Sequence, residues 1–490
     1  MKPNVRRFLC LLGLVLLPIP AAAQSANGNG DATHDPRFQE AVQLFEIWLD
    51  AKMAYEQIPA VSVALVDDQE TVWSQGYGFA HPDQGVPATT NTLYSICSIS
   101  KLFTSIGVMQ QRDAGKLRLD DPVSKHLPWY TLEQVYPDGP QVTVEGILTH
   151  SSGLPRESAH PYWTGPDFPF PTRDEVIEGL DSQATLYPAQ RYFQYSNLGM
   201  SLAGQLIEAA SGMEYAEYVH ENILAPLGLS NTHPEIPEAH RGGQLATGYD
   251  RLTREGTRGE APFFQARGIA PAAGYASTVE DLARFASWQF RLLESGGTEV
   301  LDVNTLREMH RVHWVDPDLE TMWGLGFAVG KRDGDVNIGH GGSCPGFRST
   351  LQLVPAKKVA GVVMMNAMAN PSAVWGQMAS LLVPALQVAK DDPEGAETTP
   401  VAFAKYEGIY GSTWGESAVL RWKGGLGMVG LPAADADAGL TKLKHVEGDL
   451  FRRVREDGEL GEAYVFEVVN GVAVRMSVHG NSSERTGDLP

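Results

Sequence analysis

Cysteine and positive charge are both scarce in this chain, and each shortage excludes a class of protein. The 490 residues include only three cysteines, Cys10, Cys97 and Cys344, which is too few for a small fold held together by disulfides. Lysine and arginine total 38 against 59 aspartate and glutamate residues, which gives a formal net charge of −21. A charge of this sign repels nucleic acid and anionic membrane surfaces. We therefore expect no nucleic-acid partner.

Long apolar runs and cofactor motifs are also missing. After the N-terminal region, no apolar stretch approaches the ~20 residues that a transmembrane helix needs. The sequence shows no repeat of solenoid period, no Gly-rich phosphate-binding loop and no metal-ligand spacing of His and Cys. It thus predicts no stable membrane insertion, and nothing in it demands a cofactor or a metal.

The N-terminus has the pattern of a cleavable export signal. Basic residues precede an apolar run over residues 8–19, and the small residues Ala21-Ala22-Ala23 that follow are typical of a signal-peptidase site. Cys10 lies near the start of the apolar run rather than at the cleavage region, which argues against a lipid anchor. We expect residues 1–23 to be a signal peptide and the mature protein to be periplasmic or secreted.

The chain is longer than one hydrophobic core usually serves, so we expect two domains. Residues 24–390 form the larger one, residues 391–400, rich in acids and proline, form a linker, and residues 401–490 form a small β-barrel-like domain. Strand patterns lie at both ends of the larger part, helical patterns fill its middle, and short strand patterns recur in the tail. The expected strands are 61–66, 71–74, 326–329, 347–354, 359–365, 418–422, 428–431, 463–469 and 472–478, and the expected helices include 198–210 and 279–293. The fold class is therefore α/β (α+β): an antiparallel sheet flanked by helices with a helical subdomain, followed by a small all-β domain.

The string Ser98-Ile99-Ser100-Lys101 begins a predicted helix and carries the first candidate site. Side chains three residues apart on a helix are neighbours, so the Lys101 amine lies within reach of the Ser98 hydroxyl. Partial burial lowers the pKa of a lysine, and the neutral amine can then accept the serine proton and activate the nucleophile. The helix N-terminus adds backbone N–H groups that favour a developing oxyanion. Taken alone, the string also fits a capped helix with a solvated lysine.

Two further segments supply polar side chains to a common cleft. Tyr195 and Asn197 belong to one loop before a predicted helix, where they can serve as acid/base and as amide donor. His340-Gly341-Gly342-Ser343 is placed at the start of a late strand, where glycines such as Gly342 let a substrate approach the backbone closely. Together with the first motif, these segments indicate a hydrolytic site.

The three motifs, in this order and at these separations, resemble those of the penicilloyl-recognising serine hydrolases, the superfamily of class C β-lactamases, D,D-peptidases, D-aminopeptidases and related esterases. The resemblance implies a β-lactamase/transpeptidase-like fold in which Ser98 carries an acyl-enzyme intermediate and Lys101 and Tyr195 form the proton-transfer pair. It also implies that Asn197 is a donor to the substrate amide and that the N–H groups of Ser98 and Ser343 form the oxyanion hole. Either Lys101 or Tyr195 takes the first proton, because two coupled groups titrate as a pair.

The resemblance spans residues 40–390 and departs from the class C pattern in the third motif, which is usually Lys-Thr-Gly. Here the motif begins with His340, which is mostly neutral at neutral pH and binds a substrate carboxylate less well than lysine does unless Arg348 compensates. This third motif resembles those of the D-aminopeptidase and esterase branches, and the C-terminal β domain is similar to appendages of peptidase-like relatives. We therefore expect an exported serine hydrolase of the peptidase or esterase type, acting on a small-molecule or peptide substrate. The alternatives are a class C-like β-lactamase and a penicillin-binding sensor that is acylated without turnover.

The sequence leaves three points open and gives one expectation for His150. His340 either shapes the oxyanion strand or touches substrate. Cys97 and Cys344 each adjoin a motif and form either a disulfide or two packed thiols. The aromatic residues of segment 162–170 either cover the substrate as a lid or pack locally. His150 is expected to make structural hydrogen bonds rather than to complete a Ser-His-Asp triad.

Overall fold

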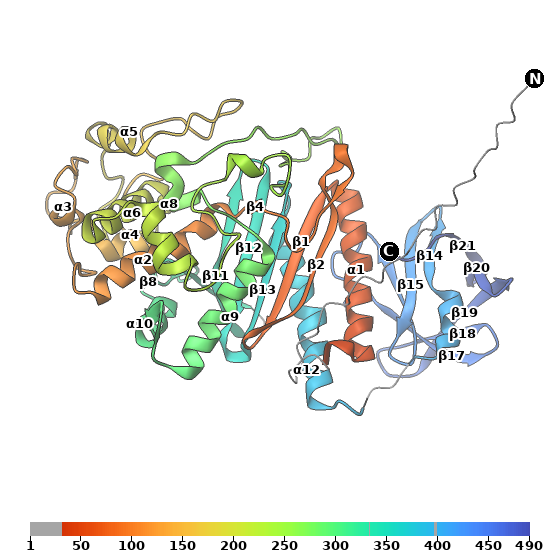
Figure 1. The fold of residues 1–490 in the computed structure, drawn as a ribbon. Coiled ribbons are helices and arrows are strands. Elements are labelled where there is room, and N and C mark those ends of the chain that lie inside the picture. Colours follow the sequence, from red (N-terminus) through yellow and green to blue (C-terminus); the bar gives the residue numbers. More distant parts are fainter. Residues whose placement is uncertain (1–31, 333, 396–398) are drawn as a thin grey trace, which may run out of the picture.

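A nine-stranded antiparallel sheet forms the centre of the larger part of the molecule (Figure 1). The computed structural model describes residues 32–332, 334–395 and 399–490, so the predicted signal peptide, residues 1–23, lies outside the described residues. The strand order is β3-β2-β1-β13-β12-β11-β10-β9-β8, and each neighbouring pair is antiparallel. The strands are β1 (Ala60–Asp67), β2 (Glu70–His81), β3 (Val86–Pro87), β8 (Trp314–Val315), β9 (Met322–Trp323), β10 (Ala328–Arg332), β11 (Asp335–Cys344), β12 (Phe347–Val354) and β13 (Val359–Met365).

The central strands of the sheet come from distant parts of the chain. β1 pairs with β13 in a register that runs from Val61↔Met365 to Asp67↔Val359, and every residue of both strands is buried. Alternate side chains of β1 enter two separate hydrophobic cores, one on each face of the sheet. Burial on both faces explains why β1 and β13 read as nearly continuous apolar runs in the sequence.

Helices cover both faces of the sheet (Figure 1). One face shares its core with α1 (Pro36–Glu56), α11 (Pro371–Gln377) and α12 (Val383–Asp391), and the other shares its core with α9 (Val279–Ser295). Thr278 caps α9 by accepting a hydrogen bond from the Asp281 N–H at 3.2 Å. The cap fixes the start of the helix where the sequence placed it.

Most of the other helices form a subdomain beside the sheet, in which α2 is the central element and contacts both α6 and α8. Nearly every residue of α2 is buried, so it crosses the subdomain as a core helix rather than as a surface helix. The helices are α2 (Ser100–Asp113), α3 (Val123–His126), α4 (Val144–Leu148), α5 (Arg173–Glu178), α6 (Asn197–Ser211), α7 (Tyr215–Val219), α8 (Ala270–Ala273) and α10 (Val303–His310). Two short pairs, β4 (Tyr94–Ser95) with β5 (Ala276–Ser277) and β6 (Thr298–Glu299) with β7 (Leu301–Asp302), complete the larger part.

The C-terminal part is a closed eight-stranded barrel that packs against α1 (Figure 1). Trp422 of the barrel enters the same hydrophobic core as α1, and the Trp48 indole N–H of α1 donates a hydrogen bond to Ala433 O at 3.0 Å. The segment predicted as a linker, 391–400, is described except for residues 396–398. The barrel strands, in order, are β14 (Gly408–Ser412), β15 (Gly415–Trp422), β16 (Gly425–Leu431), β17 (Thr441–Glu447), β18 (Leu450–Val454), β19 (Leu460–Val469), β20 (Val472–Val478) and β21 (Asn481–Gly487).

The structure confirms the expected fold class and corrects two details of the sequence interpretation. The His340-Gly341-Gly342 motif lies in the second half of β11, not at the start of a strand. Residues Pro371–Asp391 also form a helical stretch that is long and apolar enough to span a membrane, although the sequence pattern indicated none. Half of that stretch is buried inside the molecule, where it shares a core with α1 and the sheet.

Candidate active site

Ser98 lies on a 3₁₀ turn, Cys97–Ile99, that leads directly into α2. From Thr92 to Met109 it is the one residue that is not buried. Ser100, the other serine of the motif, is buried and hydrogen-bonded to the backbone, since its Oγ donates to Cys97 O and accepts from the Tyr275 N–H at 3.0 Å. The turn therefore presents only the Ser98 hydroxyl to the surface.

Lys101 is fully buried, and its amine meets three oxygen atoms. Its Nζ lies 3.1 Å from Ser98 Oγ, 2.8 Å from Asn197 Oδ1 and 2.7 Å from Ala272 O. An amide or backbone carbonyl oxygen can only accept hydrogen bonds. In a neutral amine these two acceptors take both N–H bonds, and the nitrogen lone pair is left facing the Ser98 hydroxyl.

The surroundings of Lys101 favour the neutral amine. Burial lowers the pKa of Lys101 well below its usual value, because the ammonium ion loses its hydration. The negative charge of Glu157 opposes this by raising the Lys101 pKa, and the positive charge of Arg156 lowers it. The net direction is the one that a proton acceptor at neutral pH requires.

Tyr195 lies over the Lys101 amine, with the Nζ atom 4.7 Å from its ring centroid. Burial raises the pKa of Tyr195, and a hydrogen bond with Ser98 lowers it to a smaller extent, so the phenol keeps its proton at neutral pH. His150 packs against this ring, with centroids 4.3 Å apart, and its Nδ1 accepts a hydrogen bond from the Ser196 N–H at 3.2 Å. This contact supports the tyrosine loop and is the structural hydrogen bond expected of His150.

Asn197 connects Lys101 to a residue that the sequence motifs did not reveal, Glu157. The Asn197 amide nitrogen donates to both carboxylate oxygens of Glu157 at 2.9 Å, while its oxygen accepts from Lys101. Glu157 also accepts a hydrogen bond from Tyr162. A single glutamate in a loop has no partner at a fixed spacing, so no sequence pattern could reveal it. The structure places this negative charge in contact with Asn197, and close enough to Lys101 and Tyr195 to affect their pKa values.

The third motif forms the opposite wall of the site along β11. Gly342 passes so close to the serine turn that a Cβ atom there would lie 2.2 Å from Ile96 O, which explains the glycine. Ser343 is exposed, and its Oγ accepts a hydrogen bond from Arg348 Nη1 of β12 at 2.7 Å. His340 is buried, its Nδ1 lies 2.6 Å from Gly341 O, and its Nε2 has no protein partner among the described residues. Its ring packs against Trp323 and lies 6.2 Å from the Tyr195 ring, centroid to centroid.

A cleft of about 920 Å³ joins these elements. Ser98, Asn197 and Ser343 all line it, so the structure brings the three motifs to one cavity. Its other lining residues include the aromatic and charged side chains of Trp163, Phe168, Arg156, Glu157, Asp250, Arg251 and Glu260. The aromatic residues of segment 162–170 pack on Phe264 and on one another, as one of the two sequence interpretations expected, and Trp163 and Phe168 also line the cleft.

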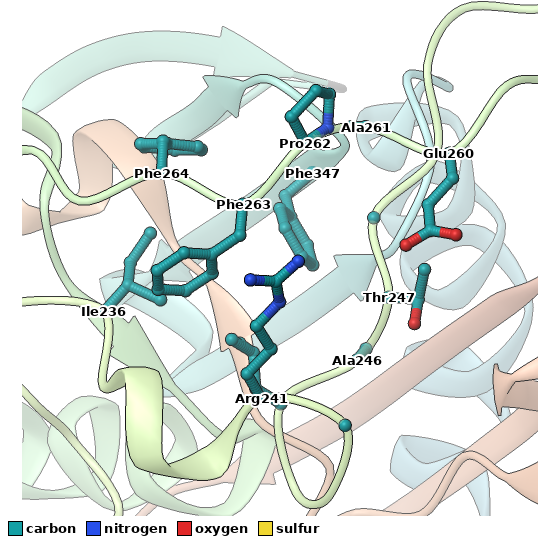
Figure 2. Close-up of a pocket in the computed structure, with 13 residues that line it drawn as sticks. Ile236, Arg241, Ala246, Thr247, Glu260, Ala261, Pro262, Phe263, Phe264 and Phe347 are labelled. Carbon is teal, nitrogen blue, oxygen red and sulfur yellow. The ribbon is translucent and has the colours of Figure 1, made fainter. Parts of the chain in front are cut away.

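A second, smaller pocket of about 50 Å³ adjoins the cleft (Figure 2). The two cavities share Glu260 and Pro262, and the Arg241 guanidinium lies 5.2 Å from the Phe263 ring centroid in the smaller one. None of the side chains predicted from the motifs lines this pocket. Within residues 32–332, 334–395 and 399–490, no group of three or more His, Cys, Asp or Glu side chains is arranged to hold a metal ion.

The two buried histidines of the site, His150 and His340, should make the fold sensitive to acid. Burial lowers the pKa of His340 to about 3 and that of His150 well below its usual value. Such a group binds a proton only after unfolding, so its stabilising effect is complete above about pH 6.5 and is lost as the pH falls toward the folded-state pKa. His340 alone should lower the free energy of unfolding by up to about 1.4 kcal/mol per pH unit between about pH 6 and 4, and His150 acts in the same direction. Urea unfolding of the wild type and of His340→Gln in this range measures the effect, and a variant with the full wild-type slope would contradict the expectation.

Comparison with known proteins agrees with this geometry. A model of the family described as Beta-lactamase matches residues 45–379 of the chain. "Beta-lactamase-like protein 2" of Dictyostelium discoideum is 27% identical over 392 residues, which cover 78% of this chain and 70% of that protein. "D-alanyl-D-alanine-carboxypeptidase/endopeptidase AmpH" of Escherichia coli (strain K12) is 26% identical over 321 residues, which cover 62% of this chain and 79% of that protein.

Among solved structures, the octameric penicillin-binding protein homologue from Pyrococcus abyssi has the same fold. It superposes with a TM-score of 0.62 at 24% identity and covers 90% of this chain and 99% of its own. The coverage extends beyond the region matched by the family model and therefore includes much of the C-terminal barrel.

Proposed function

The chain belongs to the beta-lactamase family, and on that basis we propose that it is an exported serine hydrolase that cleaves an amide or ester through an acyl-enzyme on Ser98. The observation that carries the proposal is the buried Lys101 amine, which has two acceptor-only partners and lies 3.1 Å from the one exposed hydroxyl of its turn. This arrangement supports removal of the Ser98 proton as the substrate binds. Peptide and ester hydrolysis share the chemistry that follows.

In the first half of the reaction, the neutral Lys101 amine accepts the Ser98 proton and Oγ attacks the substrate carbonyl. The N–H groups of Ser98 and Ser343 stabilise the oxyanion of the tetrahedral intermediate. The Lys101 ammonium or the Tyr195 phenol then protonates the leaving amine or alcohol. Water enters and releases the acyl group by the reverse sequence, which restores Ser98. Lys101 is favoured as the first acceptor because its pKa is lowered while that of Tyr195 is raised.

The cleft supports a peptidase or esterase more than a β-lactamase. Its third motif offers a neutral His340 in place of a cation, and Glu157 adds a negative charge next to Asn197. Both features weaken binding of a substrate carboxylate beside the nucleophile. Arg348, the cation proposed to compensate, donates from Nη1 to Ser343 Oγ and keeps its positive charge.

The proposal is tested with mature protein and three substrates: a nitrophenyl ester, a D-alanyl anilide and a chromogenic cephalosporin. We expect steady turnover of the ester or the anilide at a higher kcat/KM than the cephalosporin, and a covalent acyl adduct on the peptide that contains Ser98 in quenched-reaction mass spectrometry. Faster cephalosporin turnover would favour the β-lactamase alternative, and a stoichiometric adduct without turnover would favour the sensor. An adduct on another residue would refute the mechanism. Export predicts a periplasmic or secreted product whose N-terminus is Gln24.

Substitution of Glu157 should shift the pH dependence of turnover. The carboxylate raises the Lys101 pKa, so Glu157→Gln should lower it and move the acid limb of the kcat/KM profile to lower pH. The amide can still accept a hydrogen bond from Asn197. Glu217→Gln on the exposed face of α7 is the matched control, since it removes the same charge away from the cleft. A shift to higher pH, or an equal shift in both variants, would contradict this assignment.

A further inference from the structure

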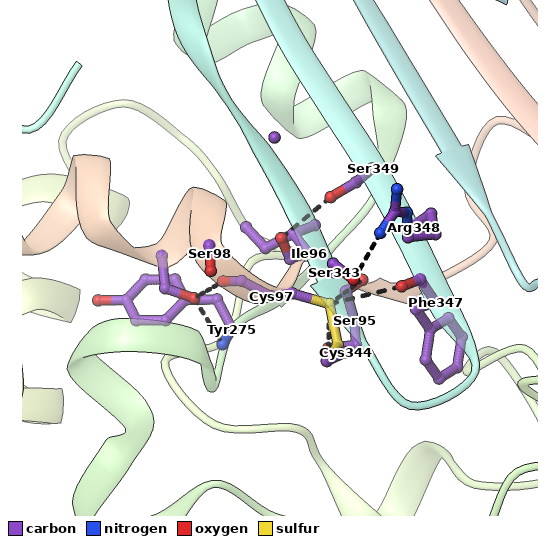
Figure 3. Close-up of a disulfide and its surroundings, with 12 residues drawn as sticks. Ser95, Ile96, Cys97, Ser98, Tyr275, Ser343, Cys344, Phe347, Arg348 and Ser349 are labelled. Carbon is purple, nitrogen blue, oxygen red and sulfur yellow. Dashed lines mark hydrogen bonds between the residues drawn. A yellow bond between two sulfur atoms is a disulfide. The ribbon is translucent and has the colours of Figure 1, made fainter. Parts of the chain in front are cut away.

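A disulfide joins the serine turn to the third motif (Figure 3). It links Cys97 to Cys344 across 247 residues of sequence, with the two Cα atoms 5.7 Å apart. Cys97 is fully buried and Cys344 is 4% exposed, although Cys344 also borders the cleft. Of the two arrangements left open by the sequence, the structure has the disulfide.

The two cysteines flank the two residues whose N–H groups form the proposed oxyanion hole. Cys97 immediately precedes Ser98, and Cys344 immediately follows Ser343. A peptide bond is planar, so the Ser98 N–H lies in one plane with the Cα and carbonyl of Cys97. A restraint on the Cys97 backbone therefore also restricts the direction of the Ser98 N–H. The disulfide does this from β11, the strand that carries the second donor.

Cys97 needs such a restraint because its backbone is in an unfavourable conformation. Its φ angle is +52°, in the left-handed region. For a residue with a Cβ this conformation costs about 1–2 kcal/mol of conformational free energy. Such conformations persist where the surrounding structure enforces them, and they cluster at functional sites. The Ser100 hydroxyl, which donates to Cys97 O, is one such contact, and the disulfide is the covalent one.

The contacts on Ile96 hold the turn against the sheet, whereas the Cys97–Ser98 peptide is held through its carbonyl by Ser100. The Ile96 N–H donates to Tyr275 O at 2.8 Å, and Ile96 O accepts from Ser349 Oγ at 3.0 Å. These hydrogen bonds hold the turn against the sheet even when the disulfide is absent. Loss of the disulfide should therefore leave the fold and the cleft in place, while the peptide that carries the first oxyanion donor keeps its Ser100 contact, loses its covalent restraint and moves more freely.

We propose that Cys97 and Cys344 are positioning residues, whose disulfide aligns the two oxyanion donors so that full turnover requires the oxidised protein. This inference rests on the proposed function. In forming the bond, the two thiols give two electrons and two protons to a disulfide oxidant such as oxidised glutathione, which becomes two thiols. After residues 1–23 are removed, these are the only cysteines in the sequence, so neither has another partner within the chain. An exported chain meets oxidising conditions only outside the cytoplasm, and the hydrolase would thus mature after export.

The expected effect is a loss in kcat rather than in substrate binding. Removing one oxyanion donor costs about 10²–10³ in kcat, and a misplacement of about 1 Å costs up to about 10². Reduction displaces the donors without deleting them. We therefore expect kcat to fall about tenfold to a hundredfold, with KM changed by less than about twofold, because KM does not depend on contacts made only in the transition state.

The test compares oxidised wild type, wild type reduced with dithiothreitol, and the Cys97→Ala/Cys344→Ala variant, each shown to be folded by near-ultraviolet circular dichroism. Hydrolysis of the nitrophenyl ester gives kcat and KM. Inhibition by a phenylboronic acid measures the geometry of the oxyanion hole, because its serine adduct places an oxygen there. We expect reduction to lower kcat and weaken boronate binding, and oxidised glutathione to restore both. The double variant should have a low kcat that dithiothreitol does not change.

Two outcomes would overturn the inference: a folded reduced enzyme with the kcat of the oxidised one, or a loss confined to KM. A kcat that falls only in proportion to the folded fraction would also overturn it, because that result assigns the disulfide to stability alone. Failure of the proposed function is separate, since it shows as turnover by oxidised protein that survives Ser98→Ala. If turnover requires Ser98 but does not change when the disulfide is reduced, only the proposed role of the disulfide is refuted.

Discussion

Ser98→Ala should reduce kcat/KM for the preferred ester or anilide by at least about 10⁴-fold, because removal of a serine nucleophile leaves only binding and the oxyanion hole to act on the substrate. KM should change little where it reflects binding, and the adduct seen by mass spectrometry should disappear. The hydroxyl is partly exposed, so its loss opens no cavity in the core and the variant should unfold at the wild-type temperature.

Ser105→Ala is the matched control for that experiment. Ser105 lies on the same helix, α2, and its buried Oγ has no partner among the described residues. Removing it costs no hydrogen bond, so wild-type turnover is expected. If Ser98→Ala keeps more than about 1% of wild-type kcat/KM with the protein free of contaminating hydrolase, the nucleophile lies elsewhere.

Lys101→Met should lower kcat by about 10³-fold, within the range of 10²–10⁴ that a positioned general base contributes. Methionine has similar length and volume and fills the same buried space, but it has no lone pair basic enough to take the Ser98 proton. Two acceptors, Asn197 Oδ1 and Ala272 O, lose their donor. Stability should nevertheless fall only modestly, since the substitution also removes an amine that is costly to bury.

Comparison with Tyr195→Phe separates the two possible bases. If Lys101 accepts the first proton, the acylation rate measured in single turnovers should fall more in Lys101→Met than in Tyr195→Phe, which keeps the ring against His150. Lys125→Met is a control on an exposed lysine of α3. A larger acylation defect in the tyrosine variant would transfer the role of first base to Tyr195.

Local rules predicted the parts of the site that lie on one element. The Ser98–Lys101 contact follows from the spacing of neighbours on a helix, and the caps and apolar faces placed α6 and α9 to within two residues of their observed ends. Nearly continuous apolar runs likewise located β1 and β13. These signals depend on side chains close in sequence, and tertiary contacts did not override them.

The features that the sequence did not predict depend on contacts between residues distant in sequence. Strand propensity disfavours glycine, so the pattern put the third motif at the start of a strand, whereas pairing with β12 carries β11 through Gly341 and Gly342. Glu157 and the Cys97–Cys344 bond have no local signature, because each acquires its role only when another element packs against it. In the barrel, β17 and β21 expose most of their side chains and lack the apolar alternation that identified β15 and β20.

The pairing of β1 with β13 also determines when the molecule can fold. The partner of β1 is synthesised about 300 residues after it, and pairings between residues so distant in sequence form slowly. Until β13 arrives, β1 has an unpaired edge and two apolar faces, which is the state that aggregates most readily. The rate of refolding in vitro should therefore be limited by closure of this strand pair.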